Sequence, residues 1–339
     1  FVVTTVHSAE DGLARVLTNG IDVVISDIRL PGRDGLSLLG DLRRQRPGVP
    51  VIMITAFHDM ETTVAAIQNG AVDYVPKPID LDELDTAIDR TLSRGRDSER
   101  GLVLAANEPG HTQMIGQSSA MKEVFKNIAL IAQSRVTVLI LGESGTGKEL
   151  VARAIHSASA ERMLPFVAIN CATLIETLLE SEMFGHERGA FTGAVSAHKG
   201  KIEMVGEGTL FLDEVSELSP PMQGKLLRVL EEREYSPVGS TQIKNSRARF
   251  ITATNVDLHQ RINQGLFRQD LFYRLNVASI QLPPLRERRG DIPILVEFLL
   301  RKINRDLRKN IRRVSGDAMA CLSRYHWPGN VRQLENVLM

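Results

Sequence analysis

The segment from Gly142 to Glu149 constrains the fold of this chain more than any other part of its sequence. It reads Gly-Glu-Ser-Gly-Thr-Gly-Lys-Glu, follows the apolar stretch Val136–Leu141 and precedes an amphipathic stretch, Leu150–Ile155. Glycines let backbone N–H groups turn toward phosphate oxygens, and the N-terminus of the following helix adds a favourable dipole. This order of strand, turn and helix predicts an α/β fold with a phosphate-binding loop. Its candidate nucleotide contacts are Gly142, Glu143, Ser144, Gly145, Thr146, Gly147, Lys148 and Glu149.

Two positions of this loop carry specific expectations. Lys148 would reach the β- and γ-phosphates of a bound nucleotide. The next residue is Glu149, where such loops usually carry Ser or Thr. Direct coordination of Mg²⁺ by a hydroxyl is therefore not expected there, and a carboxylate or a water molecule would take that place.

Two adjacent carboxylates, Asp213 and Glu214, follow the apolar stretch Thr209–Leu212. In a parallel sheet the carboxyl end of such a strand lies beside the phosphate-binding loop. Asp213 would then hold Mg²⁺, and Glu214 would polarise the water that attacks the phosphate. An Asp-Glu pair after a strand is often only a solvated turn, but the loop upstream favours the catalytic interpretation. The expected ligands are a nucleoside triphosphate and Mg²⁺, and the expected chemistry is hydrolysis of the terminal phosphate.

The alternation of strand-like and helix-like stretches divides the chain into blocks. With 339 residues it is too long for one ordinary core. Residues 1–92 alternate short apolar runs with amphipathic stretches, which predicts a doubly wound parallel sheet. A polar stretch over 93–113 is the expected linker, a second α/β block spans 114–284, and the pattern over 285–339 turns helical. The predicted fold class is α/β in both blocks, with a small helical subdomain at the end.

Composition argues against several other classes of protein. Lys and Arg together number 41, as do Asp and Glu, so the formal net charge of +0 gives no support to a globally basic nucleic-acid-binding surface. The two cysteines, Cys171 and Cys321, show no metal-ligand spacing and no disulfide framework, which fits a reduced, cytoplasmic environment. No apolar run reaches the roughly 18 residues of a membrane span, so no membrane partner is expected.

The segment Gly189-Ala-Phe-Thr-Gly-Ala194 is the most specific marker of a family. From its residues alone it is a small-residue loop with one exposed aromatic, Phe191, and one hydroxyl, Thr192, and an ordinary Gly-Ala turn would look similar. Together with the phosphate-binding loop, however, residues 114–339 resemble the AAA+ domain of NtrC-family activators of sigma-54 RNA polymerase. In that family this loop touches sigma-54. The partner loop implied by the resemblance comprises Gly189, Ala190, Phe191, Thr192, Gly193 and Ala194.

Five further residues take their roles from the same resemblance. Asn170 is similar to the asparagine that pairs with the catalytic Glu, and Asn255 to the sensor that contacts the γ-phosphate or the attacking water. Arg268 and Arg274 resemble arginine fingers, which neighbouring subunits of a hexameric or heptameric ring supply to each other. Arg332 resembles the lid arginine that contacts nucleotide in its own subunit. The alternatives are a strand-end turn for Asn170 and surface salt bridges for Arg268 and Arg274.

Residues 1–92 resemble a response-regulator receiver domain. Asp27 ends an apolar strand and would be the phosphoacceptor, with a sensor histidine kinase as the implied partner. Thr55 would hydrogen-bond the phosphoryl oxygen, Lys77 would neutralise its charge, and Tyr74 would be the rotating aromatic that reports phosphorylation. Asp27 alone would more often be a turn residue, but three such residues at strand ends favour a site.

The full family architecture is larger than this chain. We expect the receiver to lack its first strand, its first helix and the acidic pair that binds Mg²⁺. We also expect the chain to stop inside the helical lid, before the helix-turn-helix through which full-length members bind DNA. The resemblance implies an ATP-hydrolysing, ring-forming, receiver-regulated activator that remodels the closed promoter complex of sigma-54 RNA polymerase. The alternatives are an AAA+ remodeller of another protein partner and a nucleotide-locked module that senses phosphorylation without turnover.

Overall fold

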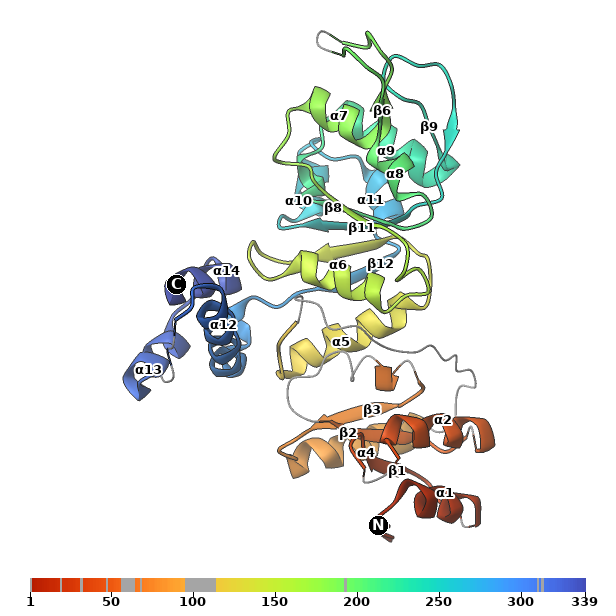
Figure 1. Ribbon diagram of the computed structural model, residues 1–339, viewed down its shortest axis with the longest axis vertical. Helices are drawn as coiled ribbons and strands as arrows, with labels where there is room; N and C mark the ends of the chain where they lie inside the picture. The colour runs from red at the N-terminus through yellow and green to blue at the C-terminus, as the bar shows by residue number, and fades with distance from the viewer. Residues whose placement is uncertain are drawn as a thin grey trace. The chain divides into compact units, whose positions relative to one another are not determined.

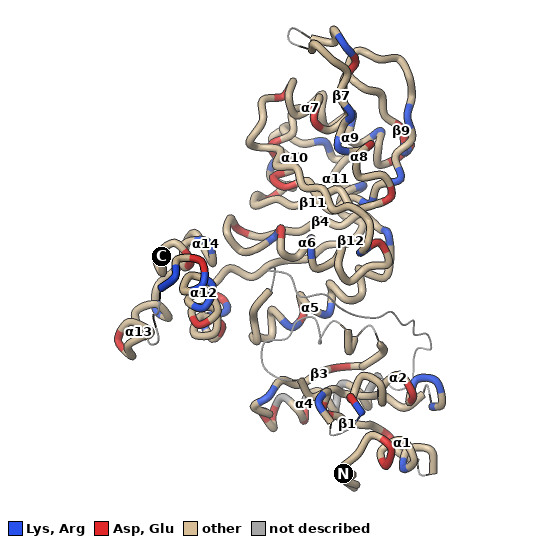
Figure 2. Tube along the Cα trace, in the orientation of Figure 1, with Lys and Arg blue, Asp and Glu red and all other residues tan. Residues whose placement is uncertain are grey.

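The chain forms two compact units, residues 1–117 and residues 118–339 (Figure 1). The computed structural model describes residues 2–18, 20–30, 33–46, 48–55, 65–67, 69–94, 114–191, 194–309, 311 and 314–339. Within these ranges no helix is long and apolar enough to cross a bilayer. Lys and Arg are mixed with Asp and Glu along both units rather than gathered on one stretch of chain (Figure 2).

The first unit is built on a parallel sheet of three strands in the order β1-β2-β3. The central strand is covered by helices, and Val51, Ile52 and Met53 in succession have no exposed surface. Consecutive buried side chains are typical of a parallel strand with both faces covered. Its elements are α1 (Ala9–Thr18), β1 (Val24–Asp27), α2 (Gly35–Gln45), β2 (Val51–Thr55), β3 (Asp73–Pro76) and α4 (Leu81–Arg94).

The second unit is built on a parallel sheet of five strands in the order β12-β4-β11-β8-β5. Leu139, Leu210 and Phe250 turn one face of this sheet toward a core shared with α7 to α11. Helices α5 and α6 pack on the sheet and on each other, opposite that core (Figure 1). The strands are β4 (Val138–Leu141), β5 (Phe166–Asn170), β8 (Thr209–Asp213), β11 (Arg249–Thr254) and β12 (Ala278–Gln281).

Helices and two small hairpins complete this α/β part. The hairpins pair β6 with β7 and β9 with β10, both antiparallel. The helices are α5 (Ser119–Ala132), α6 (Lys148–Ser157), α7 (Glu176–Phe184), α8 (Lys201–Val205), α9 (Pro220–Glu232), α10 (Leu258–Asn263) and α11 (Gln269–Leu275), with the short turn η1 (Val215–Glu217). The hairpin strands are β6 (Gly185–His186), β7 (His198–Lys199), β9 (Glu234–Tyr235) and β10 (Lys244–Asn245).

A small helical lid follows β12. The lid helices lie on one side of the five-stranded sheet (Figure 1). Trp327 lies in the turn before its last helix, where the ring is 2% exposed and its indole N–H donates to the carbonyl of Leu322 at 2.8 Å. This turn is therefore a packed corner rather than a loose connection. The lid comprises η2 (Leu285–Glu287), η3 (Arg289–Asp291), α12 (Ile292–Asp306), α13 (Gly316–Arg324) and α14 (Asn330–Leu338).

The α/β fold class expected from the sequence is confirmed, with parallel sheets in both units. The strands expected over Val136–Leu141 and Thr209–Leu212 form, the first starting two residues later at Val138 and the second extending to Asp213. The sequence pattern did not single out the edge strand β12, which pairs with β4. Its exposed and buried residues alternate on only four positions, too short a run to distinguish from a loop.

Candidate functional site

The phosphate-binding loop connects β4 to α6 at the carboxyl edge of the five-stranded sheet. Gly145 and Gly147 have left-handed backbone angles, φ +77° and +102°, which side chains other than glycine rarely adopt. The N–H of Gly142 donates to the carbonyl of Thr254 at 3.3 Å, and the hydroxyl of Thr146 donates to the carbonyl of Glu143 at 2.8 Å. The loop is thus a curled, internally bonded cradle.

Lys148 is the first residue of α6 and is 6% exposed. Its Nζ donates to the carbonyls of Gly142 at 2.9 Å and Glu143 at 3.3 Å. No ion pair among the described residues includes it. Burial lowers the pKa of Lys148, and the nearby carboxylates of Asp213 and Glu214 oppose that shift. Burying a charge is costly unless it is paired, so an anion at this position would stabilise Lys148.

Asp213 ends β8, between β11 and β5, and Glu214 follows it. Glu214 has left-handed backbone angles, φ 55° and ψ 45°, and its N–H donates to the carboxylate of Asp213 at 3.0 Å. Such angles are uncommon outside glycine and recur at functional sites. Burial is the main cause that raises the pKa of both carboxyl groups, while Lys148 opposes it. The structure therefore brings Lys148, Asp213 and Glu214 into one electrostatic site.

Asn170 and Cys171 lie next to this pair. Asn170 is the register partner of Asp213 across β5 and β8, and its amide oxygen accepts the N–H of Ala172 at 2.9 Å. Among the described residues its amide N–H group donates no hydrogen bond to the Glu214 carboxylate. The N–H of Cys171 donates to the carbonyl of Asp213 at 2.9 Å. Burial, with Asp213 and Glu214, raises the pKa of the Cys171 thiol to about 12. Cys171 is consequently a neutral packing residue of the site.

Two sensor candidates border the loop. Asn255 is exposed and directly follows β11, whose last residue, Thr254, bonds the start of the loop. Arg332 belongs to α14 of the lid, and its backbone N–H points at the carbonyl of Gly145 at 3.4 Å. Its charge contributes to the pKa shifts of Lys148, Asp213 and Glu214. The lid thus brings a second cation to the phosphate site.

Of the two arginine-finger candidates, Arg268 directly precedes α11 and Arg274 lies within it, and both form ion pairs within this single chain. Arg268 forms a two-point ion pair with Asp270, at 3.0 and 2.7 Å. Arg274 pairs with Glu231 at 3.1 Å. All four side chains are between 43% and 53% exposed. Neither arginine is among the charged groups that shift the pKa of Lys148. Within one subunit, therefore, Arg268 and Arg274 form surface salt bridges, which is the alternative stated for them from the sequence.

The remaining loop residues also have defined neighbours. Glu149 accepts two bonds from Arg153, at 3.0 and 2.6 Å, and its charge helps to raise the pKa of Asp213. Glu143 does not face the phosphate side. Its carboxylate pairs with Arg286 of the lid at 2.8 and 2.6 Å. Sequence reasoning missed Arg286, because nothing in its neighbourhood marks a partner so distant in the chain.

The partner-loop candidate extends from the hairpin of β6 and β7. The N–H of Gly189 donates to the carbonyl of Ala194 at 2.9 Å, which closes the loop at its base. Thr192 and Gly193 lie outside the described residues. The expectation of an exposed aromatic is wrong for Phe191. Its ring is half-buried and packs edge-on against the imidazole of His186, with 5.0 Å between ring centroids.

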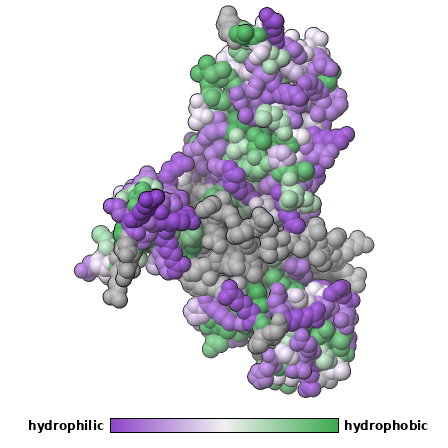
Figure 3. Space-filling model, viewed as in Figure 1, coloured by the Kyte–Doolittle hydropathy of each residue, from purple (hydrophilic) through white to green (hydrophobic). Residues whose placement is uncertain are grey.

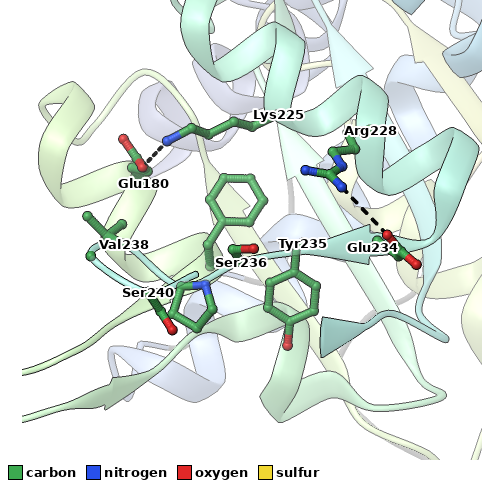
Figure 4. A pocket seen from close by; sticks show the side chains of 11 residues that line it. Glu180, Lys225, Arg228, Glu234, Tyr235, Ser236, Val238 and Ser240 are labelled. Carbon is green, nitrogen blue, oxygen red and sulfur yellow. Dashed lines mark hydrogen bonds and ion pairs between the residues drawn. The ribbon is translucent and has the colours of Figure 1, made fainter. Parts of the chain in front are cut away.

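A second segment supports this loop. The N–H of Glu187 donates to the carbonyl of Val238 at 3.0 Å, and a Cβ on Gly239 would lie 2.8 Å from the Cβ of Ala190. Beside this segment is a cavity of about 310 Å³, where Lys225 pairs with Glu180 and Arg228 with Glu234 (Figure 4). None of the proposed phosphate contacts lines it. It is therefore separate from the nucleotide site.

The receiver candidates meet at the carboxyl edge of the first unit's sheet. The Lys77 ammonium forms an ion pair with the Asp27 carboxylate. The N–H of Lys77 donates to the carbonyl of Thr55 at 2.9 Å, and Thr55 is 4% exposed. Tyr74 is buried in β3 at 5% exposure. A Cβ on Gly35 would lie 2.0 Å from the carbonyl oxygen of Asp27, so only glycine fits beside it. Asp27, Thr55 and Lys77 therefore share one site.

Comparison with known protein families matches three segments of the chain. Residues 1–89 match the response regulator receiver domain, residues 114–281 the sigma-54 interaction domain, and residues 286–339 the AAA+ ATPase lid domain.

Individual relatives match nearly the whole chain. The transcriptional regulatory protein ZraR of Salmonella typhimurium is 45% identical over 336 residues, covering 99% of this chain and 76% of ZraR. The DNA-binding transcriptional regulator NtrC of the same organism is 44% identical over 333 residues, covering 98% of this chain and 71% of NtrC. Among solved structures, NtrX from Brucella abortus in complex with ADP has a TM-score of 0.63 and 37% identity, covering 97% of this chain and 72% of that one.

Proposed function

Because this chain belongs to the family of sigma-54-dependent response regulators that includes ZraR and NtrC, we propose that it is an ATP-driven activator of sigma-54 RNA polymerase. In this proposal identical subunits assemble from dimers into a hexameric or heptameric ring. ATP turnover in the ring remodels the closed promoter complex. A sensor histidine kinase controls the process through the receiver unit.

The observation that carries the proposal is the charge arrangement at the phosphate-binding loop. Lys148 is a buried cation without a carboxylate bonded to it, beside two carboxyl groups whose pKa values are raised. The β- and γ-phosphates of ATP supply the anion that Lys148 lacks. Asp213 would hold Mg²⁺, which neutralises phosphate charge when bound. The donor set fits, since Mg²⁺ favours carboxylate oxygens together with phosphate and water.

Glu214 is the proposed general base. It directly follows Asp213, and the bond from its N–H to the Asp213 carboxylate fixes its backbone. A raised pKa brings a carboxylate nearer to the working pH and makes it a better proton acceptor than an exposed Glu. Asn170, the register partner of Asp213 in the neighbouring strand, is proposed to pair with Glu214 and to couple the nucleotide state to the loop Gly189–Ala194. Asn255 and Arg332 would read the γ-phosphate from the two sides of the loop.

Arg268 and Arg274 are proposed to act on the nucleotide of the neighbouring subunit. Their present partners, Asp270 and Glu231, form ion pairs that are about half exposed. Ion pairs so exposed to solvent are weak, so exchanging them for a phosphate group is energetically easy. The second unit also exposes large apolar side chains near α7, namely Ile175 and Leu178, at 68% and 46% exposure. Green apolar surface over the same unit is visible in Figure 3, as subunit association would require.

The loop Gly189–Ala194 is the proposed contact with sigma-54. In the sequence it lies between β6 and β7 and is separate from every proposed phosphate contact. In the receiver, phosphorylation of Asp27 would replace its ion pair with Lys77 by one between Lys77 and the phosphoryl group, and Thr55 and Tyr74 would respond to that change.

Steady-state release of phosphate from ATP tests the catalytic part of the proposal. The parent protein should turn over ATP, and Glu214→Gln should keep its affinity for ATP while turnover falls by about 10²- to 10⁴-fold. The glutamine has the same shape, so the loss would report the carboxylate's charge. Turnover of Glu214→Gln at the parent rate would remove Glu214 from the mechanism. A parent that binds ATP without releasing phosphate would favour a nucleotide-locked binding module.

A further inference from the structure

An acidic residue inside a phosphate-binding loop needs an explanation, since a carboxylate repels phosphate. In this chain Glu143 points toward the lid. The guanidinium of Arg286, in η2, donates two hydrogen bonds to the Glu143 carboxylate. The side-chain amide of Asn330, at the start of α14, donates to the same carboxylate at 3.1 Å. These two partners lower the pKa of Glu143. The Glu143 carboxylate is therefore ionised, and the guanidinium of Arg286 in the lid balances its negative charge.

Asn330 has no exposed surface and uses all of its amide groups. Its Nδ2 donates to Glu143 and to the carbonyl of Ser144 at 3.0 Å, and its Oδ1 accepts the N–H of Leu285 at 2.8 Å. Its backbone is left-handed, with φ +50°, a conformation that asparagine tolerates better than most residues. Because the Asn330 side chain forms hydrogen bonds with all of its polar atoms, it fixes the orientation of the lid relative to the phosphate-binding loop.

Backbone contacts continue the same junction. The carbonyl of Gly145 accepts the N–H of Val331 at 3.0 Å, and a Cβ on Gly145 would lie 2.3 Å from the carbonyl oxygen of Gly329. Arg332 is the next residue after Val331. The residues that fasten the lid to the loop thus directly precede the arginine whose charge reaches Lys148, Asp213 and Glu214.

From this geometry we infer that Glu143 is a positioning residue rather than a nucleotide ligand: through Arg286 and Asn330 it fixes the lid on the phosphate-binding loop and so places Arg332 at the γ-phosphate. The inference rests on the proposed function, because it gives Arg332 a nucleotide to contact. It also replaces the direct nucleotide contact that the loop sequence suggests for Glu143. The consequence is selectivity, since only ATP carries the γ-phosphate that Arg332 would meet.

The experiment compares affinities for ADP and for a non-hydrolysable ATP analogue in the full chain. Glu143→Gln keeps the shape of the side chain and removes its charge, and Arg286→Gln removes the partner from the other side. Each should weaken the ATP analogue about three- to tenfold more than ADP, in the range expected for a half-exposed, charge-assisted contact. Arg332→Ala should show the same selective loss. Adding Glu143→Gln to Arg332→Ala should change the ratio no further, because both act through the same contact.

A matched control is Glu335→Gln. It breaks the pair between Lys302 of α12 and Glu335 of α14, 2.7 Å long, which lies within the lid and does not touch the loop. Its ratio of ATP-analogue to ADP affinity should equal the parent's. An unchanged ratio in both Glu143→Gln and Arg286→Gln would overturn the inference, as would a loss that adds fully to that of Arg332→Ala. A parent that binds neither nucleotide would refute the proposed function as well, so the two failures are distinguishable.

Discussion

The two units use the same pair of groups in opposite ways. Each places a lysine and a carboxylate at the carboxyl edge of a parallel sheet. In the receiver, Lys77 and Asp27 form an ion pair whose side chains are 48% and 25% exposed. In the second unit, Lys148 is buried and bonds only to carbonyls, while burial raises the pKa of Asp213 and Glu214.

The difference indicates what each site lacks. The charges of the receiver site balance each other within the chain, since Lys77 already pairs with Asp27. The second site holds a desolvated cation beside desolvated carboxyl groups, and each of these is stabilised by a ligand of opposite charge. A nucleotide with its metal ion supplies both. Ligand binding should therefore change the second unit much more than the first.

The largest expected effect follows from removing one lysine from each site. Lys148→Ala should lower ATP affinity by more than about 100-fold and abolish turnover, because the phosphates lose their buried cation. Lys77→Ala should leave ATP affinity unchanged. Isothermal titration with ATP measures both. Equal affinities in Lys148→Ala and the parent would contradict the contrast between the sites.

The next effect concerns the groups supplied by a neighbouring subunit. Arg268→Ala should keep ATP affinity and lose turnover by about 10³-fold, as arginine fingers do elsewhere. Mixing Arg268→Ala with Lys148→Ala protein should restore part of the phosphate release, since each variant damages a different side of the shared site. If no mixing ratio restores activity, Arg268 is a structural partner of Asp270 instead.

A smaller effect is expected in the free energy of unfolding of each unit when nucleotide binds. Mg²⁺ and ADP at about 100 times the dissociation constant should raise the free energy of unfolding of the second unit by ~2.7 kcal/mol. The receiver's free energy of unfolding should not change. Hydrogen exchange measured on peptides from β8 and from β2 would report the two units separately. Equal protection of both peptides would show that the ligand does not distinguish the two sites.

The smallest effect belongs to the receiver's ion pair. Lys77→Ala should lower the receiver's free energy of unfolding by ~0.5 kcal/mol, because the pair is partly exposed and screened by solvent. Denaturant unfolding of the receiver unit measures it. A loss above about 2 kcal/mol would mean that Lys77 supports the fold beyond its pairing with Asp27.

Local patterns in the sequence predicted much of this molecule. A strand, a glycine turn and a helix are adjacent in the chain, so the phosphate-binding loop and the carboxylates at the end of β8 could be located from periodicity and residue type. The receiver residues Asp27, Thr55 and Lys77 could be located in the same way, since each follows or ends a short apolar run. Arg268 and Asp270 are only two residues apart, so their pairing could also have been anticipated.

Contacts between distant segments carried no such signal. Arg286 and Asn330 lie 143 and 187 residues from Glu143, and neither spacing nor periodicity links them. The packing of Phe191 on His186 was missed because a loop rich in Gly and Ala looks exposed throughout. The Phe191 ring is half-buried against His186, so a contact between Phe191 and a partner would compete with this packing.

Capture of sigma-54 in the presence of ADP and a metal fluoride tests the central claim most directly, namely that the second unit converts ATP turnover into work on sigma-54 through the loop Gly189–Ala194. Phe191→Ala and Thr192→Ala should keep near-parent ATPase activity and lose capture, with the loss of one aromatic anchor lowering affinity by ~2 kcal/mol, about thirtyfold. Leu130→Ala, at an exposed apolar position on α5 (60% exposed), should capture as the parent does. Undiminished capture by ATPase-competent Phe191→Ala would contradict the account and favour an AAA+ remodeller of another partner.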